Sequence, residues 1–108
     1  MKRYILTHNE IEGFHCYPNA PQICDFLSHR HRHIFVIECL FEVSHNEREI
    51  EIITQQNKIE NYLKNKYGNP CEFCDMSCES IAEELMQKYK THSVTVKEDN
   101  YGGATLTE

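Results

Sequence analysis

The sequence contains no apolar run of the about 18 residues that a membrane-spanning helix requires. Its first residues, Met1 to Leu6, also lack the apolar core of a secretory signal peptide. We therefore expect a cytoplasmic protein without a membrane partner. In that reducing compartment the six cysteines would be free thiols or metal ligands, because disulfide frameworks belong to oxidising surroundings.

Positive charge is also scarce. Seventeen acidic residues against eleven lysines and arginines give a net charge of −6, and the one basic cluster is a run of histidines and arginines. Nucleic-acid binding depends on neutralising phosphates, so this balance argues against a nucleic-acid partner. The length of 108 residues suits one domain, residues 1–108, with a single core.

The most informative stretch is Ser28–His33, in which His29, His31 and His33 alternate with arginines just before an apolar run. In a strand these histidines would share one face, with the Cα atoms of neighbouring histidines ~6.5–7 Å apart, a spacing at which two imidazoles can bind one ion. Imidazole suits zinc, copper, nickel or iron. No Asp or Glu separates the histidines, which argues against a hard-cation site. The alternative is a solvated basic loop.

The hydrophobic pattern predicts an α+β fold. We expect strands over about 2–15 and 31–44, a helix over about 53–66, a second helix capped by Ser77, and strands at 92–98 and 104–107. The order β-β-α-α-β-β corresponds to a four-stranded antiparallel sheet with two helices on one face. Gly13 is a candidate β-bulge, and residues 16–28 form a long loop.

Five motifs follow one another along the chain in an order known from one enzyme family: Ile11–His15, His31–Val36, Arg48–Ile52, Met76–Ala82 and Val94–Asp99. In these motifs and in the order of its elements, the chain resembles the 6-pyruvoyl- and 6-carboxytetrahydropterin synthases, which have the tunnelling fold. The resemblance spans nearly the whole chain.

The resemblance implies a zinc ion (Zn2+) held by His15, His31 and His33, with His29 outside the ligand set. A zinc ion with three histidine ligands keeps a fourth position, at which it can activate water or polarise a carbonyl. The competing interpretation of His15 is a half-buried histidine whose hydrogen bonds are satisfied within the protein.

The resemblance further implies that Glu98 anchors a pterin- or purine-type ring, and that Ser77 and Glu79 belong to the same substrate site. A carboxylate can accept two parallel hydrogen bonds from the N–H groups of a 2-amino-4-oxo pyrimidine edge, which makes the pairing selective. The competing interpretation of Glu98 is a solvated strand end.

Family members carry a catalytic cysteine a few residues before the H-x-H, and Cys24 lies seven residues before His31. This position implies an acid–base role for Cys24, with an inert loop cysteine as the alternative. The family's L-D-H segment, which supplies a His–Asp pair, is missing, since residues 68–75 contain no histidine. The cysteines of the following region either bind a second metal or are ordinary thiols: Cys71, Cys74 and Cys78.

Three functions are consistent with these features. The first is a zinc-dependent lyase or synthase that resembles 6-carboxytetrahydropterin synthase and acts on a pterin or purine-type molecule. The second is a catalytically inactive protein that binds or sequesters a guanine- or pterin-like nucleotide, with Arg30 and Arg32 available for a phosphate. The third is a metal-free structural protein of the same fold, which the three histidines make the weakest alternative.

The second predicted strand has apolar side chains on both faces, so a monomer would expose an apolar surface. Family members close subunits into a barrel and stack two rings. The resemblance therefore implies a homo-oligomer, specifically a hexamer, with sites at subunit junctions and the histidines of one chain facing Glu98 of a neighbour.

Overall fold

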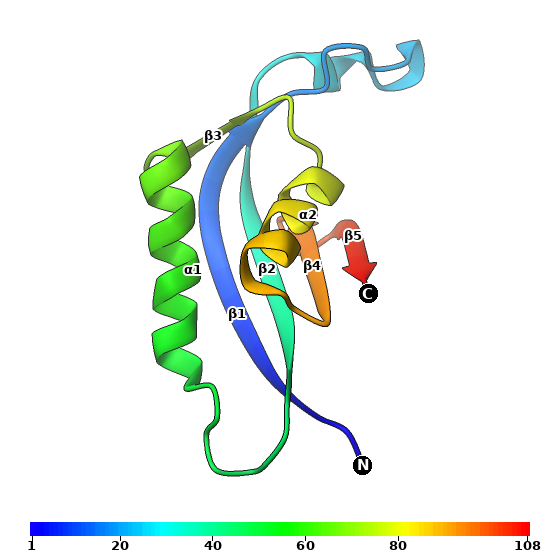
Figure 1. Cartoon of the computed structure of the whole chain (residues 1–108). Coiled ribbons are helices and arrows are strands. Elements are labelled where there is room, and N and C mark those ends of the chain that lie inside the picture. Colours follow the sequence, from blue (N-terminus) through cyan, green and yellow to red (C-terminus); the bar gives the residue numbers. More distant parts are fainter.

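The computed structural model describes residues 1–108 and has an α+β architecture, in which two helices pack on one face of a five-stranded sheet (Figure 1). No helix combines the length and the apolar character that a membrane crossing requires. A short 3-10 helix, η1, joins the two long strands. Along the chain the elements are β1 (Arg3–His15), η1 (Gln22–Ser28), β2 (His31–Val43), α1 (Ile52–Tyr67), β3 (Cys71–Cys74), α2 (Cys78–Tyr89), β4 (Ser93–Glu98) and β5 (Gly102–Thr107).

The two long strands β1 and β2 form one antiparallel ladder that runs from Arg3↔Val43 to His15↔His31. Both strands match their predicted ranges to within one residue. In β2 an alternating apolar pattern over more than ten residues marks the strand, whereas β1 is recognised from the strand-like composition of residues 3–8 and the apolar patch that ends at His15. The predicted bulge at Gly13 is wrong, since the pairing between the strands continues through Gly13↔His33.

Gly13 instead permits a close approach between a strand and an aromatic ring. A Cβ at this position would lie 2.8 Å from Cε2 of Phe73 and 3.1 Å from Cε2 of Phe35, both shorter than ordinary contacts. The absence of a side chain lets Phe73 and Phe35 pack against each other with ring centroids 5.0 Å apart. Gly13 therefore fixes the packing directly behind the histidine end of the hairpin.

The sheet has five strands rather than the predicted four, and it is mixed rather than fully antiparallel. The strand order is β3-β1-β2-β4-β5, in which β3 runs parallel to β1 and the other neighbours are antiparallel. The predicted order β-β-α-α-β-β is therefore wrong, because β3 lies between the two helices. With only two inward side chains, Cys71 and Phe73, this strand is too short to show a period.

Both helices begin and end at residues that satisfy their free backbone groups. The Glu51 carboxylate accepts from the backbone N–H groups of Ile53 and Thr54 at the start of α1, which ends at Gly68 with φ of 94°. The predicted cap of α2 is confirmed: the Ser77 hydroxyl accepts from the backbone N–H of Ser80.

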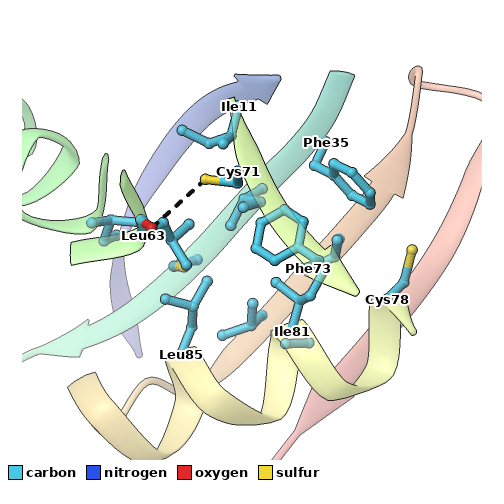
Figure 2. Close-up of a cluster of buried hydrophobic side chains, with 14 of the residues drawn as sticks. Ile11, Phe35, Leu63, Cys71, Phe73, Cys78, Ile81 and Leu85 are labelled. Atoms are coloured by element: carbon cyan, nitrogen blue, oxygen red, sulfur yellow. Dashed lines mark hydrogen bonds between the residues drawn. The ribbon is translucent and has the colours of Figure 1, made fainter. Parts of the chain in front are cut away.

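The hydrophobic core lies between these helices and the sheet (Figure 2). Leu63 from α1 and Leu85 from α2 are almost fully buried against the strands. The Cys71 thiol donates to the Leu63 carbonyl, which ties β3 to α1. This arrangement confirms the predicted placement of both helices on one face.

The opposite face of the sheet carries no helix. Side chains that alternate with the core residues of β1 and β2 lie there, and they mix charge with apolar surface. Leu6 is 52 % exposed, while His8, Glu10 and Glu38 form a charged group nearby. We refer to this surface as the open face.

Candidate metal centre

Three histidines meet on the helix-covered face of the sheet, where the register of the long hairpin brings them together. His15 lies directly opposite His31, and His33 follows two residues later on the same face of β2. The ring centroids are 4.6 Å apart for His15–His31, 5.2 Å for His15–His33 and 4.9 Å for His31–His33. Each ring offers one ligand atom, and these atoms lie within 4.8 Å of one another.

Two of the rings are oriented by backbone carbonyls. Nδ1 of His15 donates to the Met76 carbonyl at 2.9 Å, and Nδ1 of His31 donates to the His29 carbonyl at 2.8 Å. A carbonyl oxygen can only accept a hydrogen bond, so Nδ1 carries the proton in both rings. The lone pair is then on Nε2, the nitrogen available to a metal.

The third ring is oriented by a carboxylate. Nδ1 of His33 lies 2.6 Å from Oδ2 of Asp99, and the other oxygen of Asp99 accepts from the backbone N–H of Ile34 at 2.8 Å. The hydrogen bond with His33 holds the pKa of the Asp99 carboxyl below its usual value. Metal-binding histidines characteristically have such a partner on the second nitrogen, which fixes the direction of the first.

The donor set fits a metal ion. Nε2 of His15 and Nε2 of His33 are buried without a hydrogen-bond partner, a costly state for a polar atom. Nε2 of His15 also lies 3.0 Å from Oε2 of Glu98 without forming a hydrogen bond, so two electron-rich atoms face each other. Burial is the main cause that lowers the pKa of His15, which keeps its ring in the neutral, metal-binding form at pH 7. A cation at this point would satisfy all these groups.

The position of Glu98 follows from the pairing of β4 with β2. Glu98 lies opposite Phe35, so its side chain faces the same side of the sheet as His33. Its Oε1 is 3.8 Å from Nε2 of His33. The carboxylate therefore stands beside the histidines of its own chain, whereas the resemblance implied a pairing with the histidines of a neighbouring chain.

A cavity of about 560 Å3 opens beside the three histidines. The predicted substrate residues Glu98, Ser77 and Glu79 all line it, together with His15 and His31. The remaining walls come from the loop after β1, the start of α2 and the turn into β5: Cys16, Tyr17, Leu27, Asp75, Met76, Cys78, Gly102 and Gly103.

The predicted catalytic cysteine is not part of this cavity. Cys24 lies within η1, whereas the cysteines that line the cavity are Cys16 and Cys78. Burial and the neighbouring Glu98 carboxylate raise the pKa of the Cys78 thiol to about 12, so it is protonated at neutral pH. One feature of the sequence pointed to Cys78: it directly follows the helix cap Ser77.

Of the two interpretations of Cys71, Cys74 and Cys78, the structure supports ordinary thiols and not a second metal site. Cys71 is buried and hydrogen-bonded to Leu63, Cys74 is exposed, and Cys78 faces the cavity. The three histidines are the only group of metal-ligating side chains that the fold brings together. The cysteines of β3 and α2 are therefore ordinary reduced thiols.

Sequence reasoning missed the groups that orient the rings. Two of them are backbone carbonyls, at Met76 and His29, which no side-chain pattern reports. Asp99 was visible after the last residue of β4, but its role depends on the register between β4 and β2.

The arrangement as a whole can bind a metal ion on three imidazoles and can accept N–H donors of a small molecule on the Glu98 carboxylate beside it. In comparisons with known proteins, no family model and no curated protein sequence matches this chain.

Proposed function

We propose that this protein binds a zinc ion on His15, His31 and His33 and a pterin- or purine-type molecule in the adjoining cavity. The observation that carries this proposal is the convergence of three oriented rings, two of them with buried, unpartnered Nε2 atoms. Ligands of a tetrahedral zinc ion with bonds of about 2.0–2.1 Å lie about 3.4 Å apart, a spacing that small ring rotations would reach.

Zinc held by three imidazoles would supply a Lewis acid next to the cavity. The chain's own residues would bind and orient the ligand. Glu98 would accept two parallel hydrogen bonds from the 2-amino and ring N–H groups and so hold the ring in the cavity beside the metal. Ser77 and Glu79, at the start of α2, would contact the opposite part of the molecule.

We further propose that the fold is a tunnelling fold of the 6-carboxytetrahydropterin synthase type and that the activity, if present, belongs to the lyase or synthase class. The long β1–β2 hairpin, two helices on one face and the three histidines support this assignment. Cys24, however, has no support as the acid–base group within a single chain, because it does not line the cavity. This observation favours the second function, a protein that binds the ring without converting it.

The proposed assembly is a homohexamer. The support is the open face, where Leu6 is 52 % exposed beside strands that have no covering layer. Light scattering at micromolar concentration tests the assembly, with roughly six times 12.8 kDa expected. A monomer that retains zinc and ligand would contradict it.

The test of function is the binding of neopterin to the zinc-loaded protein by calorimetry. We expect binding that Glu98→Gln weakens by roughly 1.5–3 kcal/mol, the range for a hydrogen bond to a charged group, without unfolding the protein. Glu12→Gln is the matched control, because Glu12 pairs with Arg32 away from the cavity. Unchanged affinity in Glu98→Gln would remove Glu98 from the site.

Incubation with dihydroneopterin and with its triphosphate then separates the two functions. A new pterin product indicates the enzyme, and a ligand that is bound but recovered unchanged indicates the binding protein. Failure of every pterin and of guanosine to bind would contradict both.

A further inference from the structure

The charge of the cavity indicates which members of the proposed ligand class it can take. Three carboxylates line it, those of Asp75, Glu79 and Glu98, and no lysine or arginine does. His15, which is 7 % exposed, directs an unpartnered Nε2 into the same space. The acidic walls therefore belong to a built ligand site and are not an isolated acidic surface.

The nearest arginines are engaged elsewhere. Arg30 and Arg32 alternate with the histidines and so lie toward the open face. The Arg30 guanidinium stacks 3.6 Å from the ring centroid of Phe14 and pairs with Glu72. Arg32 Nε lies 2.6 Å from Oε2 of Glu12. Neither arginine is available to a phosphate in the cavity, contrary to the role that the sequence suggested for them.

A metal ion does not reverse this balance. A divalent ion offsets two of the three negative charges, and the loaded cavity remains negative. A polyphosphate would meet repulsion from the walls, which falls off over a Debye length of about 8 Å at physiological salt. An uncharged ring with several N–H donors would instead find acceptors on the same carboxylates.

We propose that the cavity selects an unphosphorylated, donor-rich heterocycle, such as a pterin with a neutral side chain, and discriminates against the corresponding nucleotide or triphosphate. This inference rests on the proposed function and adds the charge of the ligand to it. Because this discrimination between the uncharged and the phosphorylated ligand is electrostatic, both added salt and the removal of a carboxylate from the cavity wall must reduce it.

The experiment compares neopterin with neopterin triphosphate on the zinc-loaded protein by calorimetry, at low and at physiological ionic strength. At low salt we expect neopterin to bind at least about tenfold more tightly than its triphosphate. The ratio of the two affinities should become smaller as salt is added. Glu79→Gln should narrow the low-salt ratio by about threefold, because it removes one wall charge. Glu83→Gln is the matched control: Glu83 is exposed on the same helix but does not line this cavity.

The outcomes separate the inference from the function on which it rests. Binding of the triphosphate as tight as that of neopterin, or tighter, overturns the inference and leaves the proposed function standing. A ratio that Glu83→Gln changes as much as Glu79→Gln also overturns it, because the effect would then not come from the cavity walls. Binding of neither compound overturns the proposed function and the inference together.

Discussion

The histidines on the two faces of the β1–β2 pair, a group of three on one face and His8 alone on the other, have opposite environments. On the helix-covered face, His15, His31 and His33 each use Nδ1 for an acceptor and leave Nε2 directed at a common point. On the open face, both nitrogens of His8 are used: they lie 2.9 Å from Glu10 and 3.0 Å from Glu38. The comparison shows that a metal centre depends on the direction of the free nitrogens, and that a histidine near carboxylates does not make one.

His8 on the open face and His15 on the helix-covered face also differ in the direction of their pKa shifts. Hydrogen bonds to Glu10 and then Glu38 raise the pKa of His8, which favours the protonated ring. Burial lowers the pKa of His15, which favours the neutral ring. One site stabilises a proton, and the other provides neutral donors for a metal ion.

The largest expected effect is on metal content. His31→Ala and His33→Ala should each remove nearly all bound zinc, because two imidazoles hold the ion much less firmly than three. His8→Ala and His29→Ala should retain it, since His8 lies on the other face and His29 acts through its backbone carbonyl. Elemental analysis of the purified variants measures this directly. Loss of zinc in His29→Ala with retention in His33→Ala would place the ligand set two residues earlier.

A smaller effect is expected from Asp99→Asn, which removes the charge that orients His33. Asn tolerates the positive φ of 53° at this position, so the turn should persist. We expect zinc affinity to fall roughly 10–100-fold, the usual cost of losing the partner of a metal-bound histidine. Competition with a chromophoric chelator measures the affinity, and Asp75→Asn is the control, because no hydrogen bond joins Asp75 to a ligand ring. Equal losses of zinc affinity in both variants would show that the effect comes from the removal of a nearby negative charge and not from the orientation of His33.

The smallest effect is expected on the stability of the fold, through the ion pairs of His8 on the open face. A raised pKa of His8 means that its ion pairs stabilise the fold below about pH 6.5, the ordinary pKa, and that this stability is lost as pH rises through the raised value. The contribution should be less than about 1 kcal/mol, because His8 and Glu10 are largely exposed. Denaturant unfolding of His8→Gln and the original protein, both with chelator, should therefore differ more at pH 5.5 than at pH 9. A difference that grows toward pH 9 would contradict the assigned pairing.

The elements with a long period were predictable from sequence. The ranges of β2 and α1 follow from apolar residues repeated over three or more turns or pleats, that of β1 follows from its strand-like composition, and the Ser77 cap marks the start of α2. β3 could not be recognised, because Cys71 and Phe73 alone show no period and its parallel pairing with β1 joins segments far apart in the chain. This strand matters to the site: it precedes Met76, whose carbonyl orients His15.

The site was predictable to the extent that it depends on side-chain spacing. The alternation in β2 places His31 and His33 on one face, and the register adds His15 opposite His31. The position of Cys24 could not be derived, because residues 16–28 have no period and their path depends on contacts of the folded chain. The same alternation that places His31 and His33 on the cavity side of β2 places Arg32 on the other side, so this position of Arg32 was also predictable from the sequence.

X-ray absorption of the zinc-loaded protein at the zinc edge reports directly on whether the three histidines hold the metal. We expect three imidazole ligands with zinc–nitrogen distances of about 2.0–2.1 Å and no sulfur ligand. The spectrum of His8→Ala should be the same, and His33→Ala should lose the imidazole signal. A sulfur shell at about 2.3 Å, or a spectrum with fewer than three imidazoles in the unaltered protein, would contradict the assignment of the metal to His15, His31 and His33.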